Sequence, residues 1–255
     1  MDLGLKGKRA LITGGTRGIG RAIAEQLADE DVHIAICARR ADEVRQAVAA
    51  LKARGVSAMG AALDVSDGPA LKAWIKAAAH ELGGLDILVA NASALAAAAR
   101  EEDWRQSVSI DLMGTVNTVE GGMPFLERSD AASIVIIATV SAVETSRDFG
   151  VDPYGSIKAA ILHYAKSLAN AVAPKRIRVN AVSPGATYIA DGFWGRIERE
   201  SPGMFSAVVQ SIPAGRMGRP DEIANAVAFL ASPRASYITG TNLTVDGGIT
   251  SRVQF

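Results

Sequence analysis

The sequence predicts a single doubly wound α/β domain, in which helices cover both faces of one largely parallel sheet. Short apolar runs rich in Val, Ile and Leu recur along the chain and alternate with longer segments of helical period. These runs are apolar at nearly every position, which is typical of strands covered on both faces. No Pro/Gly/Ser-rich linker, composition break or internal repeat divides the chain, so residues 1–255 are expected to form one domain.

About seven strands are expected in the sheet, all parallel. Six of the segments are strongly apolar, and the third in chain order is weaker. They are Arg9–Thr13, Val32–Cys37, Ser57–Asp64, Leu85–Ala90, Ser133–Thr139, Arg178–Val182 and Asn242–Val245. Segments of helical period separate them, as in an architecture that alternates strands with helices.

The net charge limits which classes of ligand are expected, and the cysteine content indicates the cellular compartment. The 27 basic and 27 acidic side chains give a formal net charge of +0, so nothing in the charge favours nucleic acid or an anionic membrane as partner. A small neutral or singly charged ligand fits better. Cys37 is the only cysteine, so no intrachain disulfide can form, and a reducing cytoplasm is the expected setting. The three histidines lie far apart and in no ligand spacing, so no metal site is expected.

No segment favours export or a membrane span. The chain reaches a glycine turn at Gly14, which leaves no room for an apolar signal segment before it. The apolar stretch 85–99 is interrupted by Asp86, Asn91 and Ser93, and it is shorter than the about 20 residues that span a bilayer. We therefore expect a soluble protein.

A glycine-rich turn directly follows the first strand and precedes the helical segment Arg21–Asp29. Glycines let a backbone turn sharply and approach a pyrophosphate, while the start of a helix offers unpaired N–H groups to an anion. A plain glycine-rich connection is the alternative, but the position between strand and helix favours a nucleotide site. The candidate phosphate-binding residues are Gly14, Thr16, Arg17, Gly18, Ile19 and Gly20.

The spacing of these glycines resembles the T-G-x-x-x-G-x-G turn of the short-chain dehydrogenase/reductase family. Other motifs of that family follow in the same order over essentially the whole chain, with Ser93 in place of a glycine. They are Asp64-Val65, Asn91-Ala92-Ser93, Tyr154 to Lys158, Asn180 to Gly185 and Val245-Asp246-Gly247-Gly248. The resemblance implies a Rossmann fold that binds a nicotinamide dinucleotide. It also implies that the remaining cofactor contacts come from Asp64, Val65, Asn91, Tyr154, Lys158, Pro184, Gly185 and Thr187.

The end of the second expected strand bears on the choice between the two nicotinamide dinucleotides. NAD users commonly place a carboxylate there for the ribose 2′-hydroxyl, whereas NADP users place a cation near the 2′-phosphate. Here the sequence is Cys37-Ala38-Arg39-Arg40, without a carboxylate. A guanidinium can hold phosphate with two parallel bonds, so Arg39 is the first candidate and Arg17 the second. NADP(H) is therefore expected over NAD(H), although an ordinary solvated charge is the alternative for either Arg39 or Arg40.

Tyr154 and Lys158 are four residues apart in the helical stretch Asp152–Val172, so both project from one face. A free phenol has a pKa of about 10, and lowering it to about 7 takes roughly 4 kcal/mol of selective phenolate stabilisation. A nearby ammonium has the right sign for this. Tyr154 is thus the candidate general acid and base for interconverting a carbonyl and an alcohol. In the resembled family this lysine also holds the nicotinamide ribose hydroxyls.

The resembled family orients the substrate oxygen with a serine hydroxyl about thirteen residues before the tyrosine. Ser141 has that spacing, whereas the strand register places Thr139 at the equivalent strand end. We favour Ser141, because the second alignment needs a loop two residues longer before Tyr154. Thr139 stays open as the alternative.

Asp111 falls where the resembled family has an asparagine, in the stretch Ser109-Ile110-Asp111-Leu112-Met113-Gly114. The family asparagine is thought to hold a relay water through its main-chain carbonyl, which an aspartate retains. An ionised Asp111 near Lys158 would favour the ammonium, whereas a structural Asp111 would bond local backbone. The sequence leaves these two alternatives open.

The segment after Pro184-Gly185 is expected to form a substrate loop, at about residues 186–212. Its apolar side chains, Trp194 among them, suggest a pocket for a ketone or secondary alcohol with an apolar body, although ordinary helix packing explains them equally well. The resemblance implies a homo-oligomer, typically a tetramer, assembled through the two helices expected at 104–127 and 152–172. The rival hypotheses are a lyase or epimerase on the same fold and a non-catalytic NADP-sensing protein.

Overall fold

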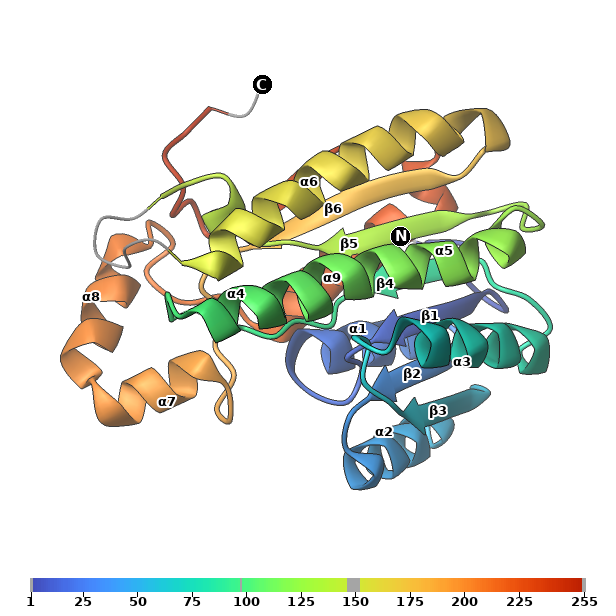
Figure 1. Ribbon diagram of the computed structural model, residues 1–255, viewed down its shortest axis with the longest axis horizontal. Coiled ribbons are helices and arrows are strands. Elements are labelled where there is room, and N and C mark those ends of the chain that lie inside the picture. Colours follow the sequence, from blue (N-terminus) through green and yellow to red (C-terminus); the bar gives the residue numbers. More distant parts are fainter. Residues whose placement is uncertain (1, 97, 146–151, 254–255) are drawn as a thin grey trace.

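A sheet of seven parallel strands forms the centre of the molecule (Figure 1), as the sequence predicts. The computed structural model describes residues 2–96, 98–145 and 152–253. The sheet has the strand order β3-β2-β1-β4-β5-β6-β7. The strands are β1 (Arg9–Thr13), β2 (His33–Ala38), β3 (Ala58–Ala62), β4 (Ile87–Ala90), β5 (Ser133–Ile137), β6 (Arg178–Pro184) and β7 (Asn242–Val245). The order reverses between β1 and β4, and ligands of such sheets bind outside the carboxyl ends of the strands at that point.

Helices cover both faces of the sheet. They are α1 (Gly18–Asp29), α2 (Ala41–Lys52), α3 (Gly68–Glu81), α4 (Glu101–Gln106), α5 (Gly114–Leu126), α6 (Pro153–Val172), α7 (Phe193–Glu200), α8 (Pro202–Ser211) and α9 (Pro220–Ala231). One core packs α1, α2 and α9 against the sheet, and a second core packs α3, α5 and α6 against the other face. Neighbouring strand residues such as Leu11 and Ile12 point into opposite cores, which explains why the runs are continuously apolar.

Helix α6 begins at a defined residue because its first turn is capped. The Asp152 carboxylate accepts a hydrogen bond from the N–H of Gly155 at 2.7 Å, and Pro153 occupies the first helical position. Both features are preferred at helix starts. They fix the first turn of the helix that carries Tyr154 and Lys158.

The stretch 104–127 is expected as one helix, but the structure divides it. A π-helical segment, η1 (Ser107–Met113), lies between α4 and α5. The wider π turn changes which residues face the interior, and such turns occur frequently at functional sites. Asp111 lies in this segment and is fully buried.

The expected substrate loop is also partly helical, since it contains α7 and α8. These two helices project together at one end of the molecule, in orange at the left of Figure 1. None of the helices in the described part of the chain is both long enough and apolar enough to cross a bilayer.

Candidate active site

The glycine turn between β1 and α1 is tightly held from two neighbouring strands. Gly14 has a φ of +69° and donates its N–H to the carbonyl of Cys37 at 2.8 Å. The Asn91 amide, at the end of β4, donates to the carbonyls of Thr13 at 2.9 Å and Gly14 at 3.2 Å. A Cβ at Gly20 would collide with the Gly14 carbonyl oxygen and with the Asn91 amide. Glycine is therefore required at both positions, and Asn91 acts as a brace for the turn.

The start of α1 is open to an anion. Arg17 precedes the helix with an extended backbone, no side chain caps the first N–H groups, and the first turn carries no acidic residue. The Thr16 hydroxyl beside it donates to Glu43 at 3.3 Å. Unpaired N–H groups and the helix dipole favour a phosphate at this point.

Three arginines near this turn differ in their partners. Arg40 is paired with Asp42 and Glu43, each at 3.2 Å. Arg17 and Arg39 are exposed and form no ion pair with any described residue. The two arginines that the sequence selects for a 2′-phosphate are thus the two that are unengaged.

Asp64 and Val65 lie just beyond β3. The Asp64 carboxylate accepts from the N–H and hydroxyl of Ser66, at 2.9 and 2.8 Å, which fixes the turn. Val65 is buried and lies against Gly114, at the start of α5. Their contact with an adenine stays a prediction.

Tyr154 and Lys158 project from the first turns of α6 toward the end of β5. The Lys158 side chain is 3% exposed, and its Nζ donates to the carbonyl of Ile137 at 2.9 Å. This Nζ lies 5.9 Å from the centroid of the Tyr154 ring. The helical spacing therefore brings both groups to one place, as the sequence predicts.

Asp111 approaches the same lysine from η1. Its Oδ1 lies 3.4 Å from Lys158 Nζ, and its Oδ2 accepts from the N–H of Ala94 at 3.1 Å. The sequence leaves open whether Asp111 faces the lysine ammonium or binds local backbone. In the structure Oδ1 does the first and Oδ2 does the second. Burial lowers the pKa of Lys158 below its ordinary value, and the neighbouring Asp111 opposes this shift.

The protein environment raises the pKa of Tyr154, the opposite direction to the lowering that the sequence leads us to expect. Burial is the main cause and raises the pKa of Tyr154 to about 12, while the carboxylates of Asp111 and Asp152 act in the same direction. A hydrogen bond with the Thr139 side chain opposes them. The phenol is consequently protonated at neutral pH, which is the form that donates a proton.

The two candidate hydroxyls occupy different environments. Thr139 is 7% exposed and hydrogen-bonds with Tyr154, and its Oγ1 also accepts from the Ser141 N–H at 3.3 Å. Ser141 lies in the short 3₁₀ segment Val140–Ala142 and is exposed. This geometry favours Thr139 over Ser141, the residue selected by spacing. The chain before Tyr154 contains residues 146–151, which lie outside the described residues.

The substrate loop leaves the sheet after Pro184-Gly185. Thr187 is buried, donates its hydroxyl to the Gly185 carbonyl at 3.1 Å and forms an isolated parallel bridge with Gly218. Tyr188 strengthens this pairing, because its N–H donates to the Gly218 carbonyl at 2.8 Å. The chain that enters the loop is therefore paired with the chain that follows it, beside the end of β6.

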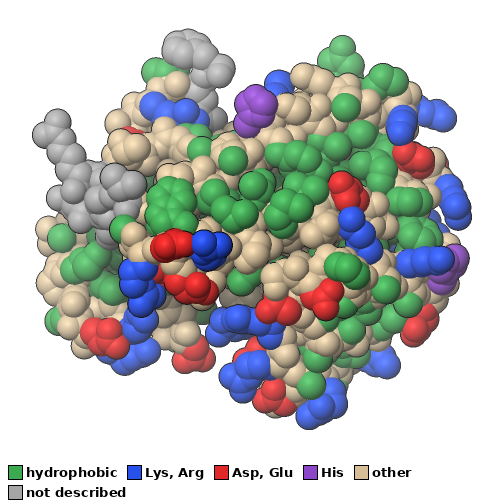
Figure 2. Space-filling model, viewed as in Figure 1, with side chains coloured by type: hydrophobic (Ala, Val, Ile, Leu, Met, Phe, Trp, Pro, Cys, Tyr) green, Lys and Arg blue, Asp and Glu red, His purple; other side chains and the backbone are tan. Residues whose placement is uncertain are grey.

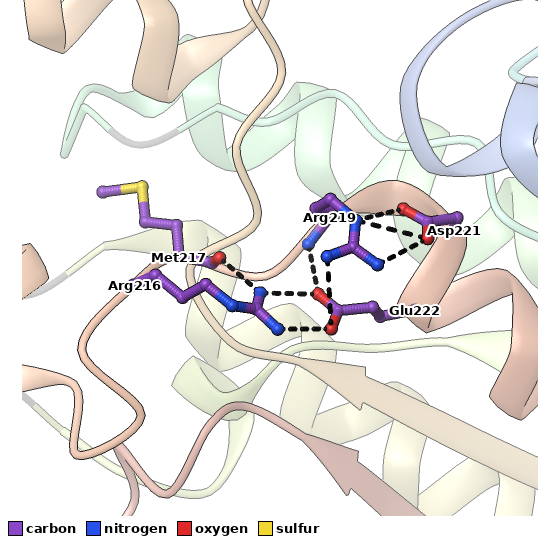
Figure 3. A network of polar contacts seen from close by, with 5 residues as sticks. All are labelled: Arg216, Met217, Arg219, Asp221 and Glu222. Carbon is purple, nitrogen blue, oxygen red and sulfur yellow. Dashed lines mark hydrogen bonds and ion pairs between the residues drawn. The ribbon is translucent and has the colours of Figure 1, made fainter.

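A polar network fixes the chain on either side of Gly218 (Figure 3). Glu222 binds the Arg216 guanidinium at 2.6 and 2.8 Å and accepts from the Arg219 N–H at 2.8 Å. Arg216 also donates to the Met217 carbonyl at 3.0 Å, and Arg219 pairs with Asp221 at 2.8 Å. These exposed contacts each contribute little energy, but together they define the path of the chain into α9.

The apolar side chains of the loop contact one another and the glycine turn. Trp194 is partly exposed, and its ring packs edge to face on Phe193 with centroids 5.1 Å apart. Ile189 lies against Gly18, so that its Cδ1 is 2.9 Å from where a Gly18 Cβ would stand. The base of the loop thus adjoins the proposed phosphate site.

Comparison with known proteins places the fold and site in context. The family model described as enoyl-(acyl carrier protein) reductase matches residues 14–250. Isoepoxydon dehydrogenase of Penicillium expansum is 38% identical over 263 residues, which covers 100% of this chain and 99% of that protein.

Two solved structures show the same fold with different dinucleotides. L-sorbose reductase from Gluconobacter frateurii, complexed with NADPH and L-sorbose, has a TM-score of 0.88 and 33% identity over 99% of this chain and 100% of that one. Carveol dehydrogenase from Mycobacterium avium, in complex with NAD, has a TM-score of 0.85 and 27% identity over 96% of this chain and 98% of that one. A nicotinamide cofactor is common to both.

Proposed function

The chain belongs to the short-chain dehydrogenase/reductase family, and we propose that it transfers a hydride between NADP(H) and a carbonyl or secondary alcohol. The observation that carries this proposal is the convergence of Tyr154, Lys158 and Thr139 at the end of β5. A proton donor, an ammonium and a second hydroxyl meet there, near the switch point of the sheet.

The residues of the glycine turn fit a dinucleotide. The uncapped start of α1 suits the pyrophosphate, and the absence of room for a Cβ at Gly20 keeps the turn compact. The preference for NADP(H) rests on Arg39 and Arg17, which are exposed and form no ion pair with a described residue. Asp64 and Val65 would contact the adenine, and Asn91, Pro184, Gly185 and Thr187 would supply the remaining contacts to the cofactor.

The mechanism assigns proton transfer to Tyr154. When bound, the nicotinamide supplies or accepts the hydride. In reduction the Tyr154 phenol would donate its proton to the carbonyl oxygen and become a phenolate, and in oxidation the phenolate would take the proton of the alcohol. Thr139 is proposed to hydrogen-bond the same substrate oxygen, with Ser141 as the alternative. Lys158 is proposed to orient the ribose, because its Nζ is fixed by Ile137 and Asp111.

The proposed substrate is a small molecule with an apolar body. The loop 186–212 presents Trp194, and it also contains the exposed side chains of Phe193, directly before Trp194, and Met204, on α8. Such a lining suits an alkyl, alicyclic or aromatic group beside the reacting carbon. The cytoplasm stays the proposed compartment.

We also propose a homo-oligomer, and a tetramer by family resemblance. Figure 2 shows hydrophobic side chains spread over the face formed by α4, α5 and α6. Val108 and Met113 lie on η1, between α4 and α5, where they are exposed and line a shallow cavity of about 430 Å³. Val108→Glu should lower the mass measured by light scattering, whereas Gln46→Glu adds the same charge on α2 and should leave the mass unchanged.

A panel of ketones and secondary alcohols, assayed with both cofactors, tests the proposed activity. Consumption of NADPH with a carbonyl compound is the expected result. Substrate change without net cofactor change would instead support a lyase or epimerase, and tight NADPH binding without turnover of any compound would support a sensing protein.

A further inference from the structure

The Asp111–Lys158 pair is the most deeply buried ion pair between described residues. The two side chains are 1% and 3% exposed, whereas every other pair in the described chain has at least one partner that is 25% exposed or more. Removing two charges from water is costly, and the cost is recovered only where the charges interact closely. A buried pair beside the proposed acid therefore calls for a physical explanation.

The two carboxylate oxygens of Asp111 have different roles, one structural and one electrostatic. Oδ2 accepts the N–H of Ala94, a task that the amide oxygen of an asparagine performs equally well. Oδ1 is buried, has no hydrogen-bond partner among the described residues, and faces Lys158 Nζ at 3.4 Å. What the carboxylate adds to this position is its negative charge.

That charge acts on Tyr154 through Lys158 and directly. An isolated ammonium near a phenol stabilises the phenolate, but an ammonium paired with a carboxylate presents little net charge. The groups around Tyr154 are Lys158 on α6, Asp111 on η1, Asp152 at the cap of α6 and the neutral Thr139 hydroxyl after β5. Both of these carboxylates oppose ionisation of the phenol.

We propose that the Asp111 carboxylate is the counter-ion of Lys158, and that this pair keeps Tyr154 a proton donor into the alkaline range. The inference rests on the proposed function, in which Tyr154 gives its proton to a carbonyl oxygen. Asp111 is a positioning residue here, because it acts through Lys158 and Tyr154. The expected consequence is a reductase whose rate persists to higher pH than it would with a neutral side chain at 111.

Asp111→Asn tests the charge while it preserves the shape and the acceptor for Ala94. The pH at which NADPH-dependent reduction falls to half should move down by about 1 unit or more, as expected when one charge next to a titrating group is removed. The maximal rate should fall far less than it does in Tyr154→Phe, because the Tyr154 hydroxyl and the contact of Lys158 with the Ile137 carbonyl remain. Asp111→Glu keeps the charge and should stay closer to wild type than Asp111→Asn.

Asp152→Asn is the matched control. It also removes a carboxylate near Tyr154 and retains a good helix cap, but Asp152 forms no ion pair with Lys158. Its effect on the pH profile should be clearly smaller. An unchanged profile in folded Asp111→Asn, or an equal shift in both variants, would overturn the proposal.

A direct titration of the phenol adds a readout that needs no turnover and no variant at position 111. The ultraviolet absorbance of phenolate is followed against pH in wild type, with Tyr154→Phe subtracted. Ionisation of Tyr154 above the ordinary phenol value of about 10 is expected, and ionisation at or below about 8 would contradict the proposal. If Tyr154→Phe retains near-normal turnover, the proposed function itself fails. If it does not, and only the pH shift is missing, this inference alone fails.

Discussion

Lys158 Nζ is held between two groups that approach from different elements, the Ile137 carbonyl at 2.9 Å and the Asp111 carboxylate at 3.4 Å. The first contact ties α6 to the end of β5, and the second ties it to the π-helical segment η1. Because these contacts restrict the position of the ammonium, Lys158 is a pre-oriented hydrogen-bond donor for a bound ligand.

The cofactor preference is tested by removing one free arginine. Arg39→Ala should raise the Kd for NADPH by about 10- to 100-fold, since hydrogen bonds to charged groups contribute ~1.5–3 kcal/mol, and should leave the Kd for NADH nearly unchanged. Arg40→Ala is the control, because Arg40 is already paired with Asp42 and Glu43. Equal or tighter binding of NADH by wild type would show that the assignment of the 2′-phosphate site is wrong.

The proton donor is tested by Tyr154→Phe, which removes the hydroxyl and keeps the ring. Turnover should fall by at least ~10²-fold, the low end for a general acid or base. NADPH binding and the unfolding midpoint should stay near wild type. A variant with near-normal turnover would exclude Tyr154 from proton transfer.

The substrate-orienting hydroxyl is tested by comparing Thr139→Val with Ser141→Ala. Thr139 is buried and bonded to Tyr154, so its loss should slow hydride transfer by about 10²- to 10³-fold, or ~2.7–4 kcal/mol for a donor aimed at the reacting oxygen. Because Ser141 is exposed, Ser141→Ala should slow hydride transfer less than Thr139→Val does. Single-turnover rates at saturating NADPH report the chemical step, and a slower Ser141→Ala would restore the assignment made from spacing.

The stability of the sheet depends on an ion pair at its opposite, amino-terminal edge. Buried Asp86 binds Arg9 at 2.7 and 2.9 Å and also accepts the Arg9 N–H at 2.9 Å. Asp86→Asn should lower the free energy of unfolding by about 2 kcal/mol, below the ~3–5 kcal/mol of a fully buried pair because Arg9 is partly exposed. Urea unfolding measures this loss, and Asp130→Asn, which removes the exposed partner of Lys8, should change little.

The same pair gives stability a defined pH dependence. Burial alone would raise the pKa of Asp86, but the bonds from Arg9 and Ser129 outweigh it and hold this pKa below its ordinary value. The pair therefore contributes fully to the free energy of unfolding above the pKa of an unfolded aspartate, about 3.9. This contribution is lost as the pH falls through the lower pKa that Asp86 has in the folded protein. Wild type and Asp86→Asn should therefore converge in unfolding free energy on acidification. A difference that stays constant down to the acid transition would contradict this assignment.

The sequence by itself determined the features that depend on local spacing. Continuous apolar runs identified the strands that are buried on both faces, whereas edge strand β3 came from a weaker run and is only partly covered. The four-residue interval between Tyr154 and Lys158 placed both on one face of α6, because the helical repeat is fixed by the backbone. The glycine turn was likewise recognisable, since its backbone admits no other residue at Gly14 or Gly20.

Only the tertiary structure decided how groups remote in the sequence meet. Asp111 faces Lys158 because a π-helical segment turns it inward, and that segment lies within a stretch that the sequence predicts as one helix. Asp111 and Lys158 bind the Ala94 N–H and the Ile137 carbonyl, which are main-chain groups. Because every residue carries such groups, the residue types do not predict these two contacts. The Thr139 side chain hydrogen-bonds with Tyr154, although Ser141 is closer to Tyr154 in the sequence. The physical reason is the same in each case: spacing along one helix follows from its repeat, whereas a distance between two elements depends on how their side chains pack.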